Sequence, residues 1–341
     1  MTAACFSTYT CLAILALTGV HGFSQPPALR ISLDSTKNVV GLAGGPILGP
    51  VRCDDGGNVY LRGFSGGQPR KTPLVRIDAD GSGYKSFDVN KTDDESMKGA
   101  LVHDFAIRGS EVYLLAGAGN NAAIVSFSPD GEYKKTVRLD HEISPSTLGV
   151  FPSGEFFISG VIAKRTSPLD KPAEFSYETA MEIVDRAGRK VANVKLASSP
   201  GRLSGSQTEI GKQLEAMDLS LATSGPEGVY FLSHSNKPRI EVISATGEVS
   251  RSFEVSLPTG DFRALALHAS AGQIMIEFVE GREDDQKYSY RTYNALTGEL
   301  LFSYELAPKE GGIFACYDWR GGFVFLSSDQ GRRVLRYARA R

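Results

Sequence analysis

Apolar and polar residues alternate in short runs along most of this chain, and clusters of Gly, Asn and Asp separate the runs. Alternation with a period of two is typical of half-buried β-strands, and these turn residues allow tight hairpins. One recurring unit has an apolar strand, a turn, a second strand of the Val-Tyr-Leu type, a variable loop and a hairpin of two further strands. We number the repeats one to six by their second strands. These are Val59–Leu61, Val112–Leu114, Phe156–Ile158, Val229–Phe231, Ile274–Ile276 and Phe323–Phe325.

The spacing of the repeats favours a β-propeller. The intervals agree with the about 40–50 residues that one four-stranded blade uses, except for a longer interval between repeats three and four. That interval contains the Pro-rich, charged segment 163–179 and the segment 197–214, which ends in a candidate helical turn. We interpret both segments as insertions without a strand pair of their own.

The two ends of the chain complete each other. The segment Ala28–Leu33 reads as a spare strand before repeat one, and repeat six lacks a full final hairpin. Pairing of Ile31 beside the strand around Val334–Tyr337 would close a ring and leave no open sheet edge. The sequence therefore predicts an all-β, six-bladed propeller closed by an N-terminal strand. A pair of β-sandwiches with coincidental spacing is the alternative.

A family resemblance agrees with this architecture. The segments DDGGNVYL, HDFAIRGSEVYL and SPDGEYKKTVRL resemble blades of six-bladed propellers of the NHL and TolB-like kind. The resemblance implies the fold for nearly the whole mature chain. It does not select a function, because that superfamily includes peptide-binding and carbohydrate-binding modules, scaffolds, lactonases and lyases.

The first 24 residues have the composition of a secretory signal peptide. An uncharged apolar run from Cys11 to Val20 is too short to span a bilayer, and small residues follow it. The run lacks the usual preceding Lys or Arg. We expect residues 1–24 to be a signal peptide, residues 25–341 to form one propeller domain, and the mature chain, without a transmembrane segment, to be periplasmic or extracellular.

Charge excludes one class of partner and the cysteines suggest a crosslink. The 37 basic and 39 acidic residues give a formal charge of −2, which provides no field for nucleic acid. Cys53 and Cys316 remain after export and stand at what we take to be equivalent inner-strand positions of repeats one and six. Neighbouring repeats in a closed ring would bring them together as a disulfide candidate. Two buried free thiols are the alternative.

Three motifs of enzymes and binding proteins have the wrong surroundings. Gly63–Gly67 matches the nucleophile elbow G-x-S-x-G, but the following residues cannot begin a helix cleanly. Gly117–Ala122 fits a dinucleotide fingerprint, but a strand follows it where a helix is needed. Asp78–Gly83 begins like an EF-hand loop, but Val89 stands where the bidentate Glu should be. We interpret all three as turns or loops.

The candidate binding residues are placed at one rim of the central channel. Asp104, Asp218 and Asp261 stand at the predicted starts of inner strands, where converging carboxylates would bind a divalent cation such as calcium or a basic or hydroxyl-rich ligand. Simple turn chemistry is the alternative for these aspartates. Three further residues are candidates on or beside these strands: His103, Arg263 and Trp319.

Two classes of function remain. The first is an exported binding or interaction module for a protein, peptide or carbohydrate ligand, with no cofactor evident. The second is a hydrolase or lyase that uses a divalent metal at the mouth of the channel. A channel site assembles from several repeats, so the linear sequence does not decide between them.

Overall fold

The computed structural model describes residues 28–63, 72–118, 121–168, 174–197, 203–234, 237–270, 272–281, 286–306, 312–318 and 321–341. The predicted signal peptide lies outside these residues. The regular structure of these residues is mostly β-strand with one α-helix, and none of their helices is long and apolar enough to cross a membrane. The all-β prediction is confirmed.

Each of repeats one to four forms an antiparallel four-stranded sheet in which the strands follow one another in chain order. Repeat one has β2 (Ile47–Cys53), β3 (Val59–Gly63), β4 (Leu74–Ile77) and β5 (Tyr84–Phe87). Repeat two has β6 (Leu101–Arg108), β7 (Glu111–Ala118), β8 (Asn121–Phe127) and β9 (Tyr133–Arg138). Repeat three has β10 (Ser144–Val150), β11 (Phe156–Arg165), β12 (Phe175–Val184) and β13 (Lys190–Asn193). Repeat four has β14 (Leu221–Ser224), β15 (Val229–Leu232), β16 (Arg239–Ile243) and β17 (Val249–Glu254).

The remaining strands form one sheet of eight, in the order β18-β19-β20-β21-β1-β24-β23-β22. Repeat five supplies β18 (Arg263–Ser270), β19 (Gln273–Glu280), β20 (Lys287–Asn294) and β21 (Leu300–Leu306). Repeat six supplies β22 (Ile313–Asp318), β23 (Gly322–Asp329) and β24 (Arg332–Ala340), and the N-terminal strand β1 (Ala28–Ala43) joins the two groups.

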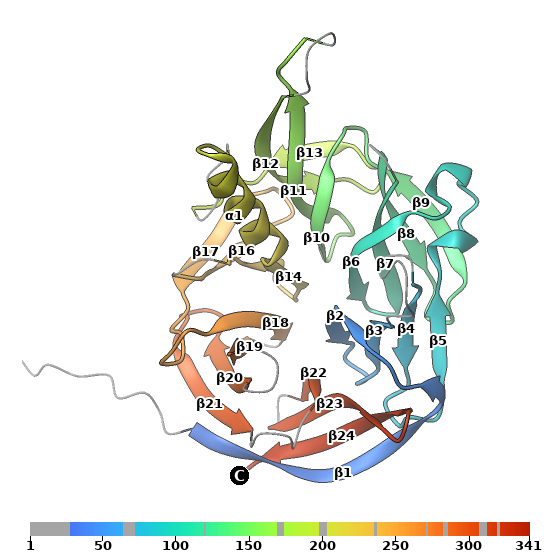
Figure 1. Cartoon of the computed structure of the whole chain (residues 1–341), viewed down its shortest axis with the longest axis vertical. Helices are drawn as coiled ribbons and strands as arrows, with labels where there is room; N and C mark the ends of the chain where they lie inside the picture. The colour runs from blue at the N-terminus through green and yellow to red at the C-terminus, as the bar shows by residue number, and fades with distance from the viewer. Residues whose placement is uncertain are drawn as a thin grey trace, which may run out of the picture.

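The sheets stand around a centre in a propeller-like ring, with the first strand of every repeat innermost (Figure 1). Apolar side chains alternate along the strands and pack between neighbouring sheets, so the core is a series of layers rather than one central cluster. Phe87 and Phe127, for example, meet edge to face between repeats one and two, with ring centroids 6.0 Å apart.

The N-terminal strand pairs with the last strand of the chain, as the orphan strands at the two chain ends predict, and it joins repeats five and six. Residues 28–31 pair in parallel with β21, and β1 then runs antiparallel to β24. Ile31 lies opposite Ala340, whereas Val334 lies opposite Asn38, so the strand is longer than predicted and its register differs. The Val40 N–H also donates to the Gly81 carbonyl of repeat one, at 3.0 Å. One strand therefore touches repeats five, six and one.

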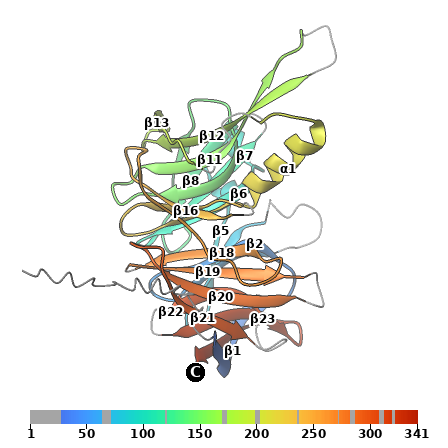
Figure 2. The same ribbon diagram turned by 90° about the vertical axis from the view of Figure 1, so that its left-hand side faces the viewer.

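The prediction that the segment 163–179 carries no strand pair is wrong. Strands β11 and β12 continue past the body of the sheet, with Ala163 opposite Tyr177 and Arg165 opposite Phe175, and form the hairpin that projects from the ring in Figure 2. The charged and Pro-rich composition hides this pairing because both faces of the hairpin are partly exposed.

The second insertion contains the only α-helix among the described residues, α1 (Gln207–Asp218). Ser206 and Glu209 form a capping box at its N-terminus, which satisfies two otherwise unpaired backbone N–H groups. The predicted helical turn is thus confirmed and is longer than expected. The helix packs through the buried Met217 and the partly buried Ile210 and Leu214 against the core between repeats three and four.

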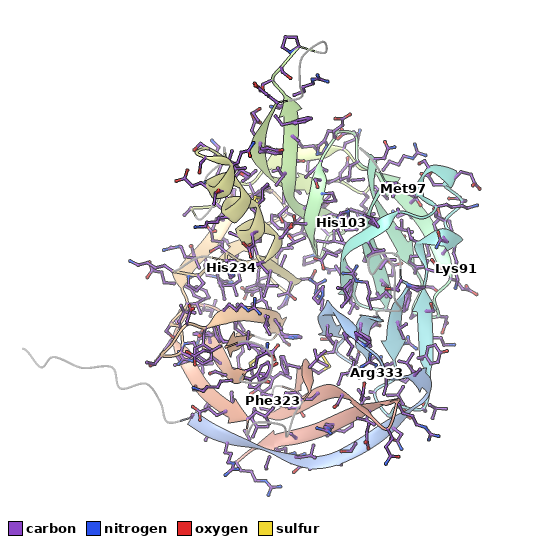
Figure 3. The ribbon with its side chains drawn as sticks, in the orientation of Figure 1. Lys91, Met97, His103, His234, Phe323 and Arg333 are labelled. Atoms are coloured by element: carbon purple, nitrogen blue, oxygen red, sulfur yellow. A yellow bond between two sulfur atoms is a disulfide. The ribbon has the colours of Figure 1, made fainter. Side chains whose placement is uncertain are left out.

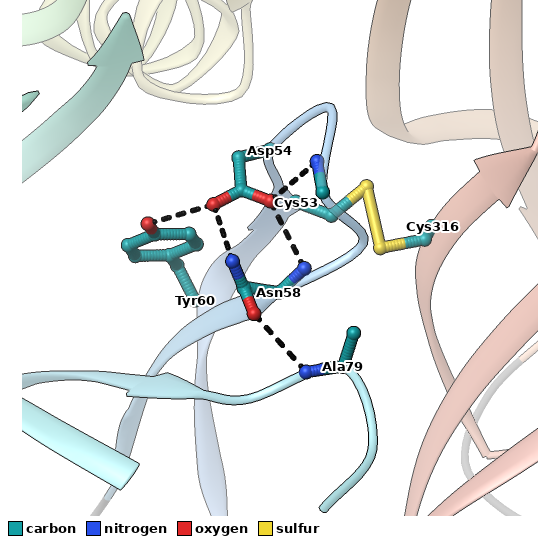
Figure 4. The surroundings of a disulfide bond; sticks show 7 residues. Cys53, Asp54, Asn58, Tyr60, Ala79 and Cys316 are labelled. Carbon is teal, nitrogen blue, oxygen red and sulfur yellow. Dashed lines mark hydrogen bonds between the residues drawn. A yellow bond between two sulfur atoms is a disulfide. The ribbon is translucent and has the colours of Figure 1, made fainter. Parts of the chain in front are cut away.

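Cys53 and Cys316 join the inner strands of repeats one and six as a disulfide, with Cα atoms 5.5 Å apart across 263 residues of sequence (Figure 4). Their positions are not equivalent as predicted, since Cys53 lies opposite Val59 whereas Cys316 lies opposite Val324, one residue further along its second strand. Beside the bond, Asp54 accepts hydrogen bonds from the backbone of Asn58 and from Tyr60 Oη, both at 3.0 Å. This network fixes the turn that follows Cys53.

We expect the bond to form under oxidising conditions and to stabilise the ring. Thiol counting on the unreduced, denatured protein should find no free thiol in the mature chain. Cys53→Ala should lower the free energy of unfolding by a few kcal/mol, because a crosslink restricts the unfolded chain most when the loop is long. The loss of chain entropy sets an upper limit of about 5 kcal/mol on this effect. Two free thiols per mature chain would contradict the prediction.

Candidate functional site

A buried ion pair lies among the inner strands of the repeats. Arg52 on β2 and Asp104 on β6 approach to 2.9 Å, and their side chains are only 12% and 4% exposed. The Arg52 guanidinium also lies over the Phe105 ring, 4.8 Å from its centroid. The prediction that Asp104 begins its strand at the channel rim is wrong, because β6 starts three residues earlier and carries Asp104 down into the interior.

This pair also satisfies backbone groups on the inner edges of the sheets. Innermost strands have one unpaired edge, and its N–H and C=O groups need partners when water is excluded. Asp104 accepts a hydrogen bond from the Leu148 N–H at 2.8 Å, and Arg52 donates to the Ala222 carbonyl at 3.1 Å. The two side chains therefore connect repeats one to four.

His268 belongs to the same central region. Burial, and next the positive charge of Arg52, lower the pKa of His268 to about 4, so the imidazole is neutral at physiological pH. Its ring meets Phe314 of repeat six edge to face, with centroids 5.1 Å apart. Repeats five and six thus complete the contacts around the centre.

The other two predicted aspartates lie elsewhere, and the three carboxylates do not converge. Asp218 is the last residue of α1 and not the start of an inner strand, and Ser146 Oγ donates to it at 2.9 Å. Asp261 is exposed in the bend before β18, where its N–H donates to Glu280 at 3.0 Å. The parts of the chain that the structure describes contain no group of three His, Cys, Asp or Glu side chains able to hold a metal.

The structure separates the remaining candidates. His103 is the extra residue of a β-bulge between Val102 and Asp104, and its half-buried ring packs against Gly117 of β7. A Cβ at Gly117 would lie 2.9 Å from His103 Nε2, so the glycine makes this packing feasible. Arg263 begins β18 with its side chain exposed. Trp319 lies outside the described residues.

A small cleft between repeats four and five brings Arg263 near a histidine that the sequence did not single out. The cleft is open to solvent and is lined by His234 and Ser233 of repeat four and by Phe262 and Arg263 at the entry to β18. Figure 3 shows His234 beside β14, on a different part of the ring from His103. Leu219, which directly follows α1, completes the wall.

The electrostatics of this cleft favour a negatively charged group. Burial, and next the nearby Arg263 guanidinium, lower the pKa of His234, so its imidazole is mainly neutral at pH 7. Arg263 is exposed and forms no hydrogen bond or ion pair with another side chain among the described residues. The cleft therefore presents a guanidinium and a neutral imidazole beside apolar walls.

Repeat five contains one further unusual group. Glu277 on β19 is 4% exposed, and burial among aromatic side chains raises its pKa from 4.5 to about 8. Tyr290 lies opposite Glu277 on β20, and Phe314 and Phe325 pack on the tyrosine ring. The carboxyl group is therefore mainly neutral at pH 7.

No family model and no curated protein matches the sequence. A Bacteroides fragilis protein inferred to be exported has a similar structure, with a TM-score of 0.53 and 9% identity over 91% of this chain and 95% of its own. A Dyadobacter fermentans protein of unknown function gives a TM-score of 0.49, 10% identity, and coverage of 91% and 99%. Virginiamycin B lyase from Staphylococcus aureus gives 0.46, 15% identity, and coverage of 90% and 99%. Sequence identities this low show similarity of fold and nothing about function. The chain is a propeller-like all-β protein.

Arg52→Met should destabilise the protein strongly, because it leaves Asp104 buried without its cation. Loss of one partner of a buried ion pair costs about 3–5 kcal/mol, and the double variant Arg52→Met, Asp104→Leu should recover part of that loss. Denaturant unfolding measures both values.

Lys164→Met is the matched control, because Lys164 pairs with Glu178 on the exposed hairpin, where the two side chains are 57% and 40% exposed. Breaking such a surface pair should cost less than about 1 kcal/mol. Equal losses for Arg52→Met and Lys164→Met would show that the central pair is not a structural constraint.

Glu277 should make the protein less stable as pH rises. The unfolded chain ionises this carboxyl near its ordinary pKa of 4.5, whereas the folded chain holds the proton up to about pH 8. Stability is therefore lost between these values, by an amount on the order of 4–5 kcal/mol. Glu277→Gln should raise the melting temperature at pH 8 and flatten its pH dependence. Glu305→Gln, at an exposed position of β21, should leave both unchanged. A wild-type profile unchanged by Glu277→Gln would refute the assignment.

Proposed function

We propose that this chain is an exported six-bladed propeller that acts as a binding module. The eight-stranded sheet supports six blades, because β18–β21 and β22–β24 with β1 each repeat the arrangement of the separate sheets and meet only through the parallel pairing of β1 with β21. In this proposal residues 25–341 form one domain. The apolar leader within residues 1–24 supports export.

The binding site in this proposal is the cleft between repeats four and five. The observation that carries this proposal is the exposed Arg263 near the half-buried His234, at the N-terminal end of β18. Guanidinium groups recognise carboxylates through paired hydrogen bonds, and loops on one face of a propeller are favoured places for ligands. The expected ligand is a protein, peptide or carbohydrate that carries an anionic group.

Binding is favoured over metal-assisted hydrolysis or lysis by the places of the described carboxylates. Asp104 is committed to Arg52, Asp218 to Ser146 at the end of α1, and Asp261 lies exposed outside the channel. A hydrolase of the predicted kind needs such groups to converge on one ion.

Arg263→Gln should weaken binding of the acidic ligand by about 10- to 100-fold, the value of one charge-assisted hydrogen bond. An array of acidic peptides and oligosaccharides, each matched by its neutral amide, identifies the probe, and titration calorimetry gives the affinity. Arg30→Gln is the control, since Arg30 is an exposed arginine on β1 at the outer edge of the ring. Equal effects of the two variants, or equal binding of acid and amide, would contradict the proposal.

A further inference from the structure

The cleft between repeats four and five is lined by two groups that can carry a positive charge. His234 lies half-buried on its repeat-four side, and Arg263 is exposed where β18 begins. Neither side chain forms a hydrogen bond or an ion pair with another side chain among the described residues. An anion in the cleft would therefore accept hydrogen bonds from both without displacing a protein partner from either.

Two charged groups among the described residues act on the His234 imidazole. Partial burial is the main cause that lowers its pKa, the guanidinium of Arg263 lowers it further, and the carboxylate of Glu215 on α1 raises it. Arg263 acts by repulsion, since its positive charge disfavours a second positive charge on the imidazole. A ligand that neutralises the guanidinium therefore makes it easier to protonate the histidine.

A bound anion would act on the histidine in two ways. Its negative charge offsets the charge of Arg263, and it accepts a hydrogen bond from the imidazolium, which is a donor at both ring nitrogens. An opposite charge within about 4–6 Å shifts a pKa by about one to three units toward the charged form. Linkage makes the effect reciprocal, so protonation of the histidine strengthens anion binding by the same factor.

We infer that His234 takes up a proton when the cleft binds an anion, so that binding is tighter in mild acid than at neutral pH. This inference rests on the proposed binding function and specifies its regulation. The proton comes from solvent and returns to it when the anion leaves, and no other bond changes. Arg263 supplies a constant positive charge, whereas His234 supplies one that depends on pH.

Titration calorimetry with sodium sulfate tests this directly, because the charge of sulfate is constant from pH 5 to pH 8. At constant ionic strength, sulfate should bind about 10-fold more tightly at pH 5.5 than at pH 7.5, the effect of a pKa rise of one to two units in one group. Titrations at pH 6.5 in two buffers with different ionisation enthalpies count the protons. They should show uptake of roughly half a proton or more for each sulfate bound.

Four variants assign the proton to His234. His234→Gln keeps a polar side chain that cannot titrate, so its affinity for sulfate should be the same at pH 5.5 and pH 7.5. Glu215→Gln, at an exposed position of α1, removes the charge that favours the imidazolium and should shift the rise in affinity to lower pH. Misfolding cannot produce such a shift. Arg263→Gln should lose most of the binding at both pH values, and the control His103→Gln, on a different part of the ring (Figure 3), should keep the wild-type profile.

The outcomes separate this inference from the proposed function. Arg263-dependent binding with equal affinity at pH 5.5 and pH 7.5 would overturn the proton uptake and leave the anion-binding function in place. A pH dependence that persists in His234→Gln would also overturn the inference alone, because another group then takes up the proton. Where sulfate does not bind, the tightest acidic probe of the array is titrated through the same series. No Arg263-dependent binding of sulfate or of any acidic probe would overturn both.

Discussion

The centre of this molecule depends on the ion pair between Arg52 and Asp104. Innermost strands carry backbone groups that no further strand can pair, and the inner strands of the repeats face one another around the centre (Figure 1). The two side chains satisfy groups of repeats three and four while neutralising each other. Removing two charges from water is costly, so this arrangement is stable only because several hydrogen bonds accompany the Coulombic attraction.

A second constraint recurs at the periphery. The residue opposite the third position of the second strand is charged and buried in three successive repeats, as Glu182, Glu241 and Arg291. Each binds the connection that precedes its own sheet. Glu182 pairs with His141 at 2.5 Å, Glu241 accepts from the Ala197 N–H at 2.8 Å, and Arg291 donates to the Ser256 carbonyl at 2.8 Å. Fixed connections of this kind explain how repeat three can carry long insertions without losing the ring.

The sequence predicts the strands well because alternation and turn residues act locally, within one hairpin. It also predicts that the N-terminal strand pairs with the last strand, because neither end strand has another partner in its own repeat. It fails for Asp218, because the helix that begins after the capping box of Ser206 and Glu209 continues as far as this aspartate. No strand pattern in the sequence shows where that helix ends. It also gives no sign of Arg52, because the contacts of that side chain come from repeats two and four and depend on the register of each.

The disulfide and the N-terminal strand connect some neighbouring repeats more firmly than others. The disulfide joins repeats one and six, and β1 bridges repeats five, six and one, so the crosslink and the N-terminal strand reinforce the same arc of the ring. Repeats four and five meet instead through apolar packing and through hydrogen bonds of Arg291 and Tyr293 to Ser256. Small adjustments cost less at such a junction than at a crosslinked one. The cleft of Arg263 and His234 lies at this junction rather than at the crosslinked one.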